Sequence, residues 1–205
     1  MGDDAAVRNG GFGVREFQLA LLDRMHDETP EQCEAALRSL RATRADAAEA
    51  EERRLQMGTH PGLGSVAGSR HWGIADYLAV LGDPVSREPH DRGATGLPVL
   101  RWDLPLWPDL WFEALEVPDG FALNCRLTRR AGVFPPRLDM VEDLRPWSCV
   151  YEEVERRFGP MEHVDGMSAV WTSAFTAPDS AGRPGRYAAA FTWGLLQSVW
   201  VNDRA

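Results

Sequence analysis

Apolar side chains recur every three or four residues through the first part of the chain, which is the period of an amphipathic helix. This spacing predicts a short helix over residues 14–26. Thr29 and Pro30 suit the N-cap and first position of a second helix, which we expect to continue to about Met57. A third helix is expected over residues 71–81.

In the second half of the chain the hydrophobic period changes to two, which is typical of half-buried strands. Two apolar stretches within 110–128, separated by a Pro-Asp-Gly turn, predict a hairpin. Their alternation places Leu123 on the same face as Leu127. A second hairpin is expected within 169–201, and a helix with Ser148 as its N-cap between the two hairpins.

These patterns predict an α+β protein, in which an N-terminal helical segment is followed by a Trp-rich antiparallel sheet made of two hairpins with one packed helix. We expect four parts along the chain. They are a disordered tail at 1–12, the helical segment at 13–82, a turn-rich linker at 83–97 and an α+β domain at 98–205.

The composition of the 205 residues is that of an ordinary globular protein, and no apolar run approaches the ~20 residues of a membrane helix. We therefore expect no membrane partner. The net charge of −9 repels a phosphate backbone, so nucleic acid is not expected as a partner either. Three widely spaced cysteines argue against a disulfide framework and favour a reducing cytoplasm. All basic residues are Arg and Ile occurs once, which suggests a GC-rich bacterial genome.

The candidate catalytic residues are Cys149, His163 and Asp165. A cysteine in the first turn of a helix has its thiolate stabilised by the helix dipole, and an imidazole oriented by a carboxylate can activate it. However, helix and strand lengths leave His163 about one helical turn short of the sulfur. The alternative is a buried structural cysteine beside a surface His–Asp pair.

Neither a cofactor nor a metal is expected. The five histidines do not have the spacing of a metal site. The glycine-rich loop at 62–68 has the composition of a phosphate-binding loop, but it follows a charged helix and no Lys comes after it. We interpret this loop as a connector.

Aromatic and basic side chains supply the candidate binding residues. Tryptophan is concentrated beyond residue 100, and a sheet of this size does not easily bury so many indoles. A cluster of arginines follows the first hairpin and could hold a phosphate or an acidic patch, the alternative being a solvated strand end. These candidates are Trp102, Trp107, Trp111, Trp193, Trp200, Arg126, Arg129 and Arg130.

Two functional hypotheses follow from these observations. The first is a non-catalytic bacterial cytoplasmic protein that acts through contact with another protein or with itself, in a regulatory, adaptor or immunity-type role. The second is a small enzyme or small-molecule-binding protein with a Trp-lined pocket. Its reactive groups would be drawn from Cys149, His163, Asp165 and Glu162.

Overall fold

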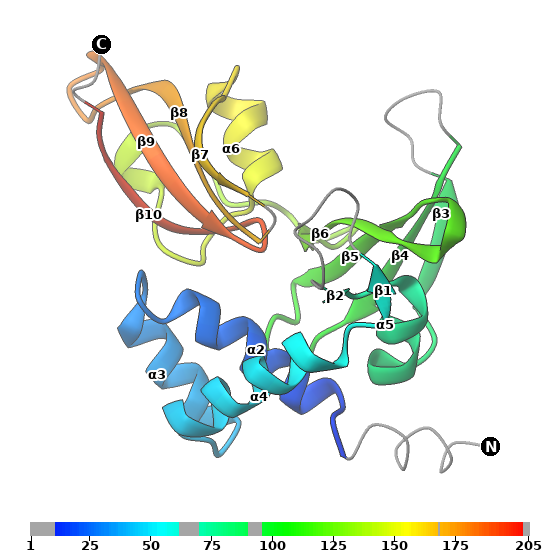
Figure 1. Ribbon diagram of the computed structural model, residues 1–205. Helices are drawn as coiled ribbons and strands as arrows, with labels where there is room; N and C mark the ends of the chain where they lie inside the picture. The colour runs from blue at the N-terminus through cyan, green and yellow to red at the C-terminus, as the bar shows by residue number, and fades with distance from the viewer. Residues whose placement is uncertain (1–10, 62–69, 90–95, 168, 203–205) are drawn as a thin grey trace.

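The computed structural model describes residues 11–61, 70–89, 96–167 and 169–202. This part of the chain contains five α-helices, four of them in the first half (Figure 1). None of these helices is long and apolar enough to cross a membrane. The helices are α2 (Val14–Met25), α3 (Pro30–Ser39), α4 (Arg44–Met57), α5 (Ile74–Leu81) and α6 (Tyr151–Phe158).

The larger strands form two antiparallel four-stranded sheets. The first sheet has the order β3-β4-β5-β6, with strands Ser86–Pro89, Pro98–Asp103, Leu110–Glu116 and Ala122–Arg129. The second sheet has the order β10-β9-β8-β7, with strands Leu195–Val201, Pro184–Thr192, Val170–Pro178 and Glu162–Met167. A two-stranded ladder joins β1 (His60–Pro61) to β2 (Arg70–His71).

The predicted α+β class is confirmed, with helices first and antiparallel strands after them. Both predicted hairpins form, as β5–β6 and as β8–β9. The strands divide between two sheets rather than one, and α6 lies against the second sheet (Figure 1). Part of the predicted linker, Ser86–Pro89, is the edge strand β3. Residues 1–10 of the predicted tail lie outside the described residues, while Phe12 is buried.

The segment expected as one helix over 30–57 forms two helices, so that expectation was wrong. Arg41 has φ +51, in the left-handed region, and interrupts the helical path. Thr43 then begins α4 with a capping box. Its hydroxyl accepts from the Asp46 backbone N–H at 3.2 Å, and the Asp46 carboxylate accepts from the Thr43 N–H at 2.7 Å. These reciprocal bonds favour a new helix start at this point.

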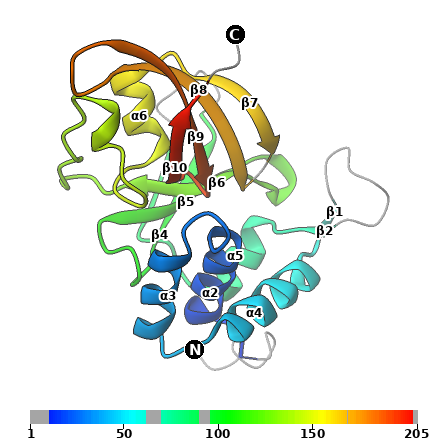
Figure 2. The same ribbon diagram turned by 90° about the vertical axis from the view of Figure 1, so that its left-hand side faces the viewer.

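Helix α2 supplies the centre of the core rather than one side of it. Most of its residues from Phe17 to Met25 are buried. The ring of Phe17 lies 4.9 Å from that of Phe112 on β5 and 5.9 Å from that of Tyr77 on α5. Figure 2 shows α2 between α3 and α4, with the sheets above it. The helical segment and the first sheet therefore share one hydrophobic core.

A buried polar network joins the helical segment to the second sheet. The hydroxyl of Thr29, which precedes α3, lies 2.9 Å from Oε1 of Gln197 on β10. The indole N–H of Trp147 donates to both oxygens, at 3.1 and 3.2 Å. Thr29 is the N-cap residue of α3, as predicted, but its hydroxyl caps no backbone N–H of that helix and takes part in this network instead. A satisfied buried network of this kind fixes one relative arrangement of the two parts.

Candidate functional site

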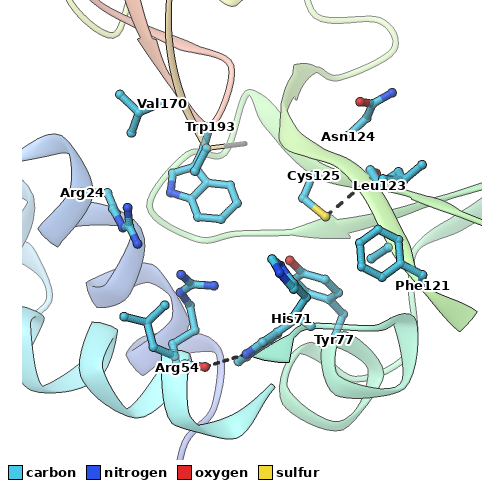
Figure 3. A pocket seen from close by; sticks show the side chains of 14 residues that line it. Arg24, Arg54, His71, Tyr77, Phe121, Leu123, Asn124, Cys125, Val170 and Trp193 are labelled. Atoms are coloured by element: carbon cyan, nitrogen blue, oxygen red, sulfur yellow. Dashed lines mark hydrogen bonds between the residues drawn. The ribbon is translucent and has the colours of Figure 1, made fainter. Parts of the chain in front are cut away.

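A cavity of about 600 Å³ opens where the helices meet both sheets (Figure 3). Side chains from α2, α4, α5, β6 and the β9–β10 turn line it. The lining contains aromatic rings, two arginines, a phenol and a thiol. The residues that carry these groups include Arg24, Arg54, His71, Trp72, Tyr77, Phe121, Cys125 and Trp193.

Two arginines of the cavity wall, which we call the cavity pair, are Arg24 on α2 and Arg54 on α4. Both contact Glu51: Arg24 Nε lies 2.7 Å from Oε1, and Arg54 Nε and Nη2 lie 2.5 and 2.9 Å from its two oxygens. Burial alone would lower the pKa of Arg54, but its hydrogen bonds and Coulomb attraction to Glu51 outweigh burial and raise it. Arg54 therefore stays charged although it is only 9% exposed.

Trp193 reaches the cavity from a two-residue turn. Trp193 and Gly194 connect β9 to β10 with φ +50 and +78, the paired positive φ values of a tight hairpin turn. A left-handed conformation is uncommon for a bulky residue. The turn is fixed because the Trp193 N–H donates to Ala169 O and the Leu127 N–H donates to Trp193 O, both at 2.6 Å. The turn thereby holds the indole at the cavity.

The indole nitrogen of Trp193 is buried and lacks a hydrogen-bond partner among the described residues. The residue is 5% exposed, and the guanidinium carbon of Arg54 lies 5.4 Å from its ring centroid. In Figure 3 the nitrogen lies on the edge of the ring that faces Arg24. An unpaired buried N–H costs about 1–3 kcal/mol, so this donor is suited to an acceptor that enters the cavity.

A β-bulge places Cys125 on the cavity wall. The β5–β6 register shifts between Glu113 and Leu115, and Asn124 opposite the shift has φ +50. The Cys125 thiol contacts the Tyr77 hydroxyl, and burial raises the pKa of both groups, that of Cys125 to about 11. Both groups therefore keep their protons at neutral pH and act as neutral polar groups.

The aromatic wall is held from behind by the core. The indole N–H of Trp72 donates to Arg54 O at 2.7 Å, and its ring lies 5.0 Å from that of Tyr77. The ring of His71 lies 6.1 Å from that of Phe121, which extends the same wall. Because these rings are packed against one another, the shape of the cavity is set before a ligand enters.

No family model, curated protein or solved structure matches this chain. The function of the cavity therefore has to follow from its own residues. In the described ranges, no group of three or more His, Cys, Asp and Glu side chains could hold a metal ion.

Of the five predicted binding tryptophans, Trp193 is the one that lines the cavity. Trp102 is buried in the core and its indole N–H donates to Gly82 O at 2.9 Å. Trp107 is also buried, with its ring 5.8 Å from that of Trp147. Both side chains therefore pack the interior.

The other two predicted tryptophans lie at the surface of the sheets. Trp111 is half-buried between the guanidinium groups of Arg101 and Arg130, at 5.2 and 5.8 Å from its ring centroid. Trp200, on the edge strand β10, is 44% exposed. Trp200 is thus the tryptophan that solvent reaches most readily among those predicted to bind.

The predicted arginine cluster is neutralised within the chain. Arg129 donates to both carboxylate oxygens of the buried Glu153, at 2.8 and 3.1 Å, and also to Ser148 O. Arg126 Nε lies 2.9 Å from Glu152 Oε1. Arg130 contacts Asp103. We call these residues the paired cluster: Arg126, Arg129 and Arg130 with Glu152, Glu153 and Asp103.

The three candidate catalytic residues lie in different environments. Helix α6 begins at Tyr151, so Cys149 lies before its first turn, and burial raises the pKa of its thiol to about 12. The Cys149 carbonyl accepts from Leu196 N–H on β10, whereas His163 and Asp165 are exposed on β7 at the opposite edge of the second sheet. Three strand spacings, about 14 Å, separate those edges.

Sequence analysis missed the cavity pair and Tyr77. Glu51 and Arg54 belong to the charged stretch of α4, yet they are buried together with two alanines. The spacing of Ala47, Ala50, Glu51 and Arg54 is that of one helical face, which was the available signal. The contact of Glu51 with Arg24, in contrast, joins residues of two helices and leaves no local pattern.

Proposed function

We propose that this protein binds a small organic molecule in the cavity between the helices and the two sheets. The observation that supports this proposal is the indole N–H of Trp193, which is buried in the cavity wall and has no partner among the described residues. A hydrogen-bond acceptor on a ligand would satisfy it. The cavity volume of about 600 Å³ falls within the range of roughly 300–1,000 Å³ that ligand pockets occupy.

The protonation of the cavity side chains supports binding rather than catalysis. The pKa of Tyr77 and that of Cys125 are both raised, chiefly by burial. Neither group is ionised at neutral pH, so neither is prepared to act as a nucleophile or a base. A protonated phenol and thiol in the same lining as an unpaired indole N–H favour recognition of a ligand.

The test is a screen of small metabolites by thermal shift and tryptophan fluorescence, followed by titration of the hits. Trp193→Phe keeps an aromatic ring and removes the N–H, and it should weaken binding of the hits about tenfold. Trp200→Phe, which changes an exposed tryptophan outside the cavity, is the matched control and should leave affinity unchanged. Equal binding by wild type and Trp193→Phe would argue against this site.

A second candidate function is contact with another protein, and the observation that favours it is the exposure of Trp200. Its neighbour Val201 is 61% exposed on the same edge strand. Exposed tryptophans are typical anchors of protein interfaces. Co-purification from a native extract should recover a partner with wild type and lose it with Trp200→Ser; recovery of the same partner by both would contradict the proposal.

We further propose that the protein works in the reducing cytoplasm of a bacterium with a GC-rich genome. Its three cysteines are free in the structure, and its basic residues are all arginine. Fractionation of the source cells with an antibody against the protein tests the location. Recovery in an oxidising compartment would contradict it.

A further inference from the structure

We infer that the ligand of the cavity carries one anionic group, a carboxylate or a phosphate monoester, attached to a flat apolar body. This inference rests on the proposed function and adds the chemical class of the ligand. The anionic group would lie against Arg24, Arg54 and the indole N–H of Trp193. The apolar body would lie among the aromatic rings of the wall.

The polar part of the described lining holds two cationic groups and no carboxylate, and its side-chain acceptors are the neutral groups of Asn124, Tyr77 and His71. The described lining includes the cavity pair and the Trp193 indole, and it includes no Asp or Glu side chain. Glu51, the carboxylate that both arginines contact, is itself buried behind them. Two guanidinium groups present ten N–H bonds, of which the two oxygens of Glu51 can accept only a few. Donors therefore remain for a group that enters the cavity.

A second internal carboxylate stands nearby but does not replace the ligand. Asp23 is close enough to Glu51 and Arg24 to interact with them electrostatically. It does not belong to the described lining, and burial followed by repulsion from Glu51 raises the pKa of its carboxyl. Asp23 thus changes the charge around α2, and the described lining of the cavity itself contains no carboxylate.

The walls favour a flat group over a branched one. In Figure 3 the Trp193 indole lies on one side of the cavity, with Tyr77 and His71 on another and Phe121 beside them. Aromatic rings prefer to stack or to meet edge to face, at centroid distances of about 4.5–7 Å. A planar ring between these walls would make such contacts and keep its anionic substituent at the arginine end.

An anion is the acceptor that best matches this set of donors. Bonds from a guanidinium to a carboxylate or phosphate are roughly twice as strong as neutral hydrogen bonds, and arginine can make two of them in parallel. A neutral ligand of the same shape would leave charged donors in the cavity without an adequate partner. The cavity should therefore distinguish an acid from its amide.

Three probes of one shape test this inference: naphthoate, its neutral amide naphthamide, and naphthyl phosphate. Calorimetric titration of the full chain should give at least about tenfold tighter binding of an anionic probe than of the amide. Tighter binding of naphthoate than of the phosphate would assign a carboxylate ligand, and the reverse order a phosphate monoester. Equal affinity of all three probes would overturn the inference while leaving small-molecule binding intact.

Variants locate the effect at the cavity pair. Arg24→Gln should lower the affinity for the anionic probes about tenfold and leave that for naphthamide within about twofold. Arg38→Gln removes the same charge from an exposed position of α3, and it should change neither the affinity for the anionic probes nor that for naphthamide. The Arg24 side chain is 40% exposed, and circular dichroism checks that the variant folds. An unchanged anion preference in Arg24→Gln would overturn the site, and absence of binding by every probe at millimolar concentration would overturn the proposed function with it.

Discussion

The two groups of arginines in this molecule differ in how their charges are balanced. In the paired cluster each guanidinium contacts a carboxylate of its own, as Arg129 contacts Glu153. In the cavity pair, Arg24 and Arg54 share Glu51. In the first arrangement two pairs join β6 to α6 and the third joins Arg130 to Asp103 on β4, so every guanidinium already has a carboxylate partner. The second leaves donors beside a cavity.

This difference shows that the number of arginines close together in sequence is a poor guide to a binding site. The arginines of the paired cluster lie within five residues of sequence, and this spacing alone suggests a phosphate site. The cavity pair is split between two helices, and its members are thirty residues apart. The cavity pair differs from the paired cluster because two guanidinium groups share one carboxylate, that of Glu51, and this is visible only in the folded structure.

The largest effect is expected from breaking the paired cluster. Arg129→Met leaves Glu153 buried without its cation, and such a loss destabilises a protein by about 3–5 kcal/mol. Urea unfolding measures the change. Arg186→Met, which breaks an exposed ion pair with Glu162, is the control and should cost less than about 1 kcal/mol. A similar small loss in both variants would show that the cluster does not hold the fold.

The cysteines beside the two arginine groups should react at different rates. Burial raises the pKa of Cys149 to about 12 and that of Cys125 to about 11, and only Cys125 lines the cavity. Iodoacetamide should therefore alkylate Cys125 at least about tenfold faster, at a rate that rises with pH up to about 11. Peptide mass spectrometry measures the alkylation rate of each cysteine. Faster labelling of Cys149 would instead support the cysteine-nucleophile hypothesis.

Removing the shared carboxylate should strengthen anion binding. Glu51→Gln keeps the shape of the side chain and frees the cavity pair from its internal counter-charge, so naphthoate should bind about tenfold tighter. Glu52→Gln makes the same change in charge at an exposed position of α4 and should have little effect. Calorimetry measures both affinities. Weaker binding to Glu51→Gln would mean that Glu51 positions the arginines more than it competes with the ligand.

The smallest effect concerns Asp23. Burial and Glu51 raise the pKa of its carboxyl above 3.8 in the folded state, so ionisation of Asp23 favours the unfolded chain. The stability that the protonated Asp23 contributes to the folded state is fully present below pH 3.8 and is lost as the pH rises through the raised pKa. Asp23→Asn should raise the melting temperature at neutral pH by about 1–3 °C. That gain should shrink on acidification, and a gain independent of pH would contradict the assignment.

Local patterns were sufficient to predict most elements of the fold. The turn at Pro118–Gly120 and the alternation around it predicted the β5–β6 hairpin, and the apolar spacing of 14–26 predicted α2. Where prediction failed, a single residue changed the geometry. The bulge at Asn124 shifts the register of β6, so Leu123 is exposed although alternation placed it beside the buried Leu127.

The candidate site could not be predicted because its determinants are not local. Arg24 and Glu51 meet across two helices, and the left-handed turn that aims Trp193 depends on contacts with Ala169 and Leu127. Sequence composition could suggest that some tryptophan serves a ligand. The indole nitrogens of Trp107, Trp111 and Trp193 are all buried without a partner among the described residues, and only that of Trp193 belongs to the cavity lining. Sequence could not indicate this, because it depends on every neighbouring acceptor in the fold.

The most direct test is the indole N–H signal of Trp193 in a proton–nitrogen correlation spectrum. The signal is assigned by its absence in Trp193→Phe, and that of Trp102, already bonded to Gly82 O, serves as an internal reference. Saturating naphthoate should move the Trp193 signal downfield as its N–H gains an acceptor, while the Trp102 signal stays in place. A Trp193 signal that does not move while calorimetry shows the probe bound would contradict the proposed site.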